Sequence, residues 1–82
     1  MNARILIADD EDSLRWVLEK GLRQAGYEVT SVKDGPGAIQ AFEAEPFDLV
    51  FLDVRMPGVD GLTALARLRE IRADACVIVM TK

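Results

Sequence analysis

Short apolar runs alternate with stretches of helical periodicity along this chain. The runs Ile5–Ala8, Leu49–Leu52 and Val77–Met80 contain only apolar residues, which is typical of strands covered on both faces of a sheet. After the first run, apolar or small residues recur at the spacing of one helix face, at Leu14, Val17, Leu18, Gly21, Leu22 and Ala25. The pattern predicts strands at Arg4–Ala8, Glu28–Val32, Leu49–Asp53 and Cys76–Thr81, and helices from about Asp12 to Ala25, Ala38 to Glu45 and Leu62 to Ile71.

The segments between these elements carry residues that cap or end helices. Asp12 or Ser13 is expected to cap the first helix, Gly26 to end it, and Pro46 to stop the second helix. Strands that alternate with helices of this length form β-α-β units, so the sequence predicts an α/β domain with a parallel sheet. The apolar residues expected to face the core from the second and third helices are Ile39, Phe42, Leu62, Leu65 and Leu68.

Acidic side chains stand at the carboxyl ends of two of the predicted strands. Asp9 and Asp10 follow the first apolar run, and Asp53 ends the third strand. Ligands of open parallel sheets bind beyond this edge, where the hydroxyl of Thr81 is also expected. Clustered carboxylates repel one another by about 4 kcal/mol per close pair at an effective dielectric constant of about 20. A hard cation such as Mg²⁺ removes this repulsion, so the pattern predicts a cation site beside a reactive carboxylate.

Composition and charge argue against several classes of protein. The 82 residues make at most one domain, half of the residues are hydrophobic, and the net charge of −4 argues against nucleic-acid or anionic-membrane partners. No apolar stretch approaches the roughly 20 residues that cross a bilayer, and the N-terminus lacks the pattern of a signal peptide. The single cysteine, Cys76, is expected to be a small core residue, and a cytoplasmic location is expected.

The order and spacing of these motifs resemble the receiver domain of bacterial two-component response regulators. The resemblance rests on Asp9-Asp10, Asp53, Met56-Pro57-Gly58, Asp60-Gly61 and Thr81. Segments 13–19, 53–58 and 80–81 are most similar to the nitrogen-regulation (NtrC-type) subfamily, whose members place the receiver ahead of an ATPase module and a DNA-binding module. The resemblance covers the whole chain and implies a flavodoxin-like parallel sheet with strand order 2-1-3-4.

The resemblance also implies a chemistry. The aspartate that matches Asp53 accepts a phosphoryl group from a sensor histidine kinase, so the chain is expected to be a phosphoacceptor module of a transcriptional regulator and not an enzyme. Mg²⁺ is the implied cofactor, with Asp9, Asp10, Asp53 and the backbone carbonyl of Arg55 as its ligands. The implied role of Thr81 is a hydrogen bond to the phosphoryl group.

Receivers of this family continue through a fourth helix, a fifth strand and a fifth helix, so residues 1–82 are expected to form a partial receiver domain. Lys82 does not match the lysine of the fifth strand, so self-catalysed phosphotransfer and dephosphorylation are expected to be impaired. The alternative is a truncated or engineered receiver fragment with structural or assembly behaviour and no signalling output. Under either function, Val77–Met80 is expected to be an uncovered apolar edge, which predicts a homo-oligomer through this strand or the surface beside it.

Simpler explanations exist for the individual acidic residues. The acids that follow the first strand favour the positive end of a helix dipole, and Asp53 can simply initiate a turn. Neither explanation accounts for acids at two strand ends together. A phosphohydrolase of the haloacid dehalogenase type also uses an aspartate after a strand, but it needs a second aspartate where this chain has Arg55.

Overall fold

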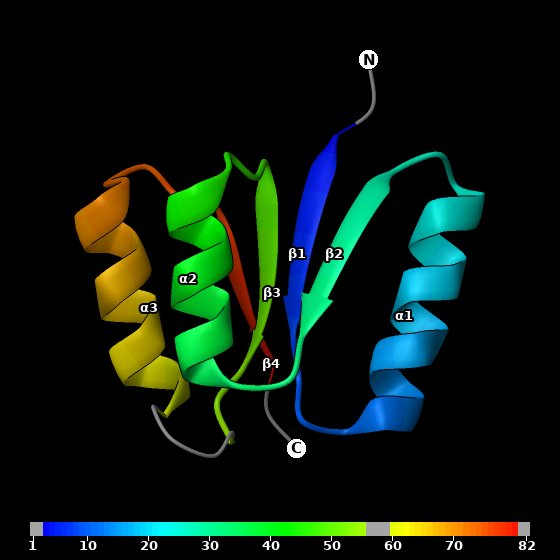
Figure 1. Ribbon diagram of the computed structural model, residues 1–82, viewed down its shortest axis with the longest axis horizontal. Coiled ribbons are helices and arrows are strands. Elements are labelled where there is room, and N and C mark those ends of the chain that lie inside the picture. Colours follow the sequence, from blue (N-terminus) through cyan, green and yellow to red (C-terminus); the bar gives the residue numbers. More distant parts are fainter. Residues whose placement is uncertain (1–2, 56–59, 81–82) are drawn as a thin grey trace.

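Strands and helices alternate along the chain in the computed structural model, which describes residues 3–55 and 60–80. The elements are β1 (Arg4–Ala8), α1 (Asp12–Gln24), β2 (Glu28–Val32), α2 (Gly35–Ala44), β3 (Leu49–Asp53), α3 (Gly61–Ile71) and β4 (Val77–Met80). All strand pairs are parallel and the order is β2-β1-β3-β4, which confirms the predicted fold. Figure 1 shows α1 on one face of the sheet and α2 and α3 on the other. No helix within the described ranges is long and apolar enough to cross a membrane.

The cap of α1 and the start of α2 differ from the prediction. Residue Glu11 occupies the cap position of α1 and makes no side-chain capping bond, so the expected cap at Asp12 or Ser13 is wrong. Helix α2 begins at Gly35, ahead of the predicted Ala38, because Asp34 caps it by accepting a hydrogen bond from the backbone N–H of Gly37 at 2.7 Å. The proline of this segment lies in the first turn, where its missing N–H does no harm.

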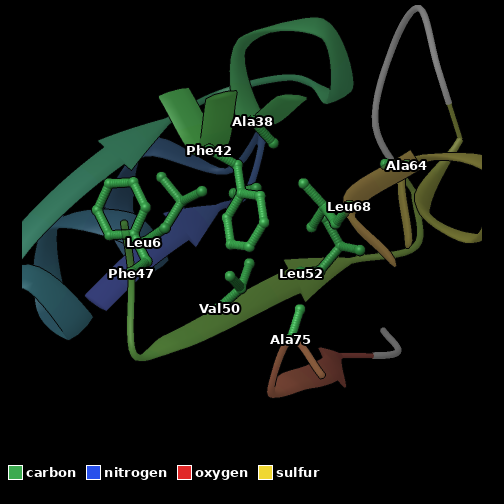
Figure 2. Close-up of a cluster of buried hydrophobic side chains, with 10 residues drawn as sticks. Leu6, Ala38, Phe42, Phe47, Val50, Leu52, Ala64, Leu68 and Ala75 are labelled. Atoms are coloured by element: carbon green, nitrogen blue, oxygen red, sulfur yellow. The ribbon is translucent and has the colours of Figure 1, made fainter. Parts of the chain in front are cut away.

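The main core lies between the sheet and the pair α2 and α3. Leu6, Val50 and Leu52 point from β1 and β3 toward Phe42 of α2 and Leu68 of α3 (Figure 2). Ile5 and Ile7 of β1 are also buried, and the alternation of side chains along a strand directs them to the opposite face of the sheet. Helix α1 covers that face (Figure 1). Burial of both faces explains why the first strand is continuously apolar.

Two residues that were expected in the core are exposed. Leu62 is 66% exposed, because the inward stripe of α3 runs through Gly61, Ala64 and Leu68 and passes to one side of it. Cys76 is also exposed, since it precedes β4 at the outer edge of the sheet. Both predictions failed because the apolar character of a residue does not say which direction it faces.

Helix α1 docks on the sheet without burying any residue completely. Leu14, Leu18 and Leu22 of the predicted face are half-buried, but Val17 is 56% exposed. Polar contacts supplement this shallow packing. Glu19 accepts a hydrogen bond from the Ser31 hydroxyl of β2, and the guanidinium of Arg23 donates to the carbonyl of Val29 at 3.0 Å. The position of α1 therefore depends on polar contacts more than that of α3 does.

Candidate functional site

The predicted acidic residues meet at the carboxyl ends of β1 and β3, which are neighbours in the sheet. Ala8 pairs with Leu52, so the next residue on each strand, Asp9 and Asp53, stands at the same level of the sheet. Backbone hydrogen bonds to the outer strands reach this level as well: the N–H of Asp9 donates to the carbonyl of Val32 at 3.1 Å, and the N–H of Val54 donates to that of Met80 at 3.2 Å. Parallel strands with this register bring the two carboxylates together without any long-range adjustment of the chain.

The carboxylates of Asp9 and Asp53 each accept the same kind of local hydrogen bond. Asp9 Oδ1 accepts from the backbone N–H of Glu11 at 2.8 Å, and Asp53 Oδ1 accepts from the backbone N–H of Arg55 at 3.0 Å. This bond to the residue two positions further on is the turn that aspartate favours at the end of a regular element. It restrains the side-chain torsions of both acids, so the site is organised by its own backbone.

Asp9, Asp10 and Asp53 form one compact group of oxygen ligands. Each offers a carboxylate oxygen, and these oxygens all lie within 4.8 Å of one another. Asp9 and Asp53 are completely buried, whereas Asp10 is exposed to solvent. Ligands of an octahedral Mg²⁺ are about 3.0 Å apart when adjacent and about 4.2 Å apart when opposite, so the three oxygens would have to draw closer together around a bound ion. The all-oxygen donor set, with one ligand facing water, fits a hard cation that keeps part of its water shell.

The other predicted site residues are placed less completely. Arg55 is exposed, and its backbone N–H donates to the Asp53 carboxylate. The metal-binding role of the Arg55 carbonyl stays a prediction. Thr81 and the turn residues 56–59 lie outside the described residues, so the role of Thr81 also stays a prediction. Asp60, on the far side of that turn, caps α3 by accepting from the N–H of Thr63 at 2.9 Å. This hydrogen bond holds the pKa of Asp60 below its usual value.

Sequence reasoning missed two residues that contact the site. Arg15 donates from Nη1 to the backbone carbonyl of Asp9 at 2.8 Å. Gly61 was noted only as part of a turn, yet its N–H donates to the carbonyl of Val54, the residue after Asp53, at 3.1 Å. A methyl group at Gly61 would lie 2.2 Å from the Val54 Cα, so only glycine fits. The spacing of Arg15, six residues after Asp9, is no recognised sequence signal for such a contact. The Asp60-Gly61 pair after a strand is a weak signal for a close turn.

Curated proteins with similar sequences are regulators that contain this kind of domain. NtrC, a DNA-binding transcriptional regulator of Escherichia coli (strain K12), is 36% identical over 77 residues. That alignment covers 94% of this chain but only 16% of NtrC, so the chain spans about a sixth of that relative. The likeness therefore concerns one domain of a longer protein.

Solved structures with the same fold include two of the response regulator TrrA from Thermotoga maritima. One holds TrrA in complex with Mg²⁺ and BeF; it has a TM-score of 0.91 and 38% identity, and the match covers 99% of this chain and 70% of that one. The other holds TrrA in complex with the histidine kinase ThkA, with a TM-score of 0.90 and 38% identity, over 99% of this chain and 69% of that one. The family model of the response regulator receiver domain matches residues 5–82. This chain therefore belongs to the receiver domains of two-component response regulators.

Proposed function

We propose that this chain is a phosphoacceptor module that takes a phosphoryl group on Asp53 with the help of Mg²⁺. The observation that carries the proposal is the completely buried Asp53 carboxylate, with oxygens of Asp9 and Asp10 within 4.8 Å of it. The complexes of TrrA with Mg²⁺ and BeF and with a histidine kinase support the same cofactor and the same class of donor. The likeness to NtrC supports a place in a cytoplasmic transcriptional regulator.

The proposed step is a phosphoryl transfer from a phosphohistidine of the kinase. An oxygen of Asp53 forms a bond to phosphorus while the P–N bond breaks, and the electron pair of that bond stays on the imidazole nitrogen. The hydrogen bond from the Arg55 N–H orients the Asp53 carboxylate for this attack. Asp9, Asp10, Asp53 and the Arg55 carbonyl are the proposed metal ligands, and the Thr81 hydroxyl is the proposed donor to the phosphoryl group. Mg²⁺ would neutralise charge on the transferring group.

Mg²⁺ binding tests the metal site directly. Calorimetric titration of the chain with MgCl₂ is expected to give one site, and Asp53→Ala is expected to weaken it strongly. Asp48→Asn is the control, because Asp48 is exposed and lies just before β3, at the opposite end of that strand from Asp53. Equal affinity in the chain and in Asp53→Ala would remove Asp53 from the site.

Phosphorylation by a small phosphodonor tests the acceptor. In the presence of Mg²⁺, borohydride trapping and mass spectrometry are expected to find the label on Asp53 and on no other aspartate. A label on another aspartate would overturn the assignment. A chain that binds Mg²⁺ but accepts no phosphoryl group would favour the alternative function, a receiver fragment with structural or assembly behaviour only.

We also propose that the chain self-associates along β4, which lies at the edge of the described sheet. Ile78 and Val79 of this strand are 45% and 38% exposed, and Ile71 at the end of α3 is 42% exposed. Burial of a few hundred Å² of such surface is worth several kcal/mol at about 25 cal/mol per Å². Sedimentation at micromolar concentration is expected to show a dimer, which Ile78→Lys should dissociate. A stable monomer at that concentration would refute self-association.

A further inference from the structure

Arg15 makes a contact with the acidic site that the proposed chemistry does not use. Its guanidinium donates from Nη1 to the backbone carbonyl of Asp9 at 2.8 Å and from Nη2 to the carboxylate of Asp12. The Arg15 side chain is only 19% exposed, although no residue of α1 is completely buried. An arginine this well covered, directed at a backbone carbonyl, has a defined position that a solvated side chain lacks.

The carbonyl that Arg15 contacts belongs to the peptide group that joins Asp9 to Asp10. On the other side of Asp9, the N–H donates to Val32 at 3.1 Å, and the carboxylate accepts from the N–H of Glu11 at 2.8 Å. Arg15 therefore holds the peptide group that links the two acids, and the orientation of that group affects the direction of each side chain. Asp10 is exposed to solvent, and this peptide group connects it to the buried Asp9.

We propose that Arg15 is a positioning residue for the metal site: it holds the Asp9–Asp10 peptide so that both carboxylates converge with Asp53. The inference rests on the proposed Mg²⁺ function of these acids. Residues outside a metal site that orient its ligands commonly change metal affinity by about 10- to 100-fold when they are removed. Because Arg15 acts through the backbone, a loss near the lower end of that range is expected.

The positioning role and the charge of Arg15 affect Mg²⁺ in opposite directions. A positive guanidinium bound to the Asp9 carbonyl opposes the approach of a cation to the acids, so removal of the charge alone would tighten Mg²⁺ binding. Removal of the hydrogen bond to the Asp9 carbonyl would loosen the two acids and weaken binding. The sign of the change in affinity therefore distinguishes the two roles.

The experiment compares three variants of the full chain by calorimetric titration with MgCl₂. Arg15→Gln removes the charge and the fork of donors, and Arg15→Lys keeps the charge but cannot make both contacts. Arg23→Gln is the matched control, because Arg23 also donates from α1 to a backbone carbonyl, that of Val29 at 3.0 Å, away from the acids. Circular dichroism at the titration temperature establishes that each variant is folded; if Arg15→Gln is not, the milder Arg15→Lys decides.

We expect Arg15→Gln to weaken Mg²⁺ binding about tenfold, Arg15→Lys to weaken it by a smaller factor, and Arg23→Gln to leave it unchanged. Unchanged or tighter binding in Arg15→Gln would overturn the inference, and so would an equal loss in Arg23→Gln, which would indicate general loosening of α1. A wild-type chain that binds no Mg²⁺ overturns the proposed function and this inference together. Wild-type binding that depends on Asp53 but not on Arg15 overturns the inference alone.

Discussion

Replacing Gly61 by alanine tests how closely the start of α3 must approach the end of β3. The added Cβ would lie 2.2 Å from the Cα of Val54, 2.7 Å from the carbonyl oxygen of Asp53 and 3.0 Å from the N of Val54. All three are backbone atoms, so no side-chain rotation can relieve the overlap. Either the first turn of α3 or the peptide after Asp53 has to move.

The size of the effect follows from two opposing terms. Overpacking of a closely packed site destabilises a protein by about 1–3 kcal/mol, and contact with backbone atoms places this site at the upper end. Alanine is a better helix former than glycine by at most about 1 kcal/mol, and less in a first turn. We therefore expect Gly61→Ala to lower the free energy of unfolding by about 2 kcal/mol, a large share of the stability of a small domain.

Urea unfolding followed by circular dichroism measures this change, with Gly21→Ala as the control. Gly21 lies inside α1, and a Cβ built there would meet no atom within 4 Å. The control is expected to gain about 0.5–1 kcal/mol from helix propensity alone, so the two variants should differ by about 2.5–3 kcal/mol. A Gly61→Ala variant as stable as the wild type would refute the close approach of α3 to the end of β3. Because the shift would reach Asp53, we also expect weaker Mg²⁺ binding in Gly61→Ala.

Three further substitutions test the helix caps and the core. Leu68→Ala should lower the free energy of unfolding by about 2–5 kcal/mol, because Leu68 is completely buried. Leu62→Ala should change it by less than about 0.5 kcal/mol, because Leu62 is 66% exposed. Equal effects of the two substitutions in urea titrations would contradict the orientation of α3. Asp60→Ala should lower the urea midpoint at pH 7, since the ionised cap accepts the Thr63 N–H and the pKa of Asp60 is lowered by that bond. The contribution of the charged cap is present above the unfolded pKa of about 3.9 and is lost as the pH falls through the lower folded pKa, so the difference from the wild type should shrink in acid.

The strands were predictable from the residue pattern because the signal is local and repeated, whereas their order came from the resemblance to the receiver family. The register of β1 and β3 in the structure then aligns Asp9 with Asp53. The helix starts were harder, because Asp34 caps a segment whose glycines and proline read as a turn. Leu62 and Cys76 were misplaced for a different reason: their exposure is set by where a helix face and a sheet edge end, which composition does not reveal.

The two helices beside the acidic site are held in different ways, and the difference has a consequence for signalling. Helix α3 is fixed by buried Ala64 and Leu68 and by the close approach of Gly61, so a change of charge at the site has little power to move it. Helix α1 buries no residue completely and depends on polar contacts, one of which runs from Arg15 to the Asp9 carbonyl. A cation or phosphoryl group bound as proposed would alter the charge around Asp9 and so act on that contact. We therefore expect α1, and not α3, to respond first when the site is filled.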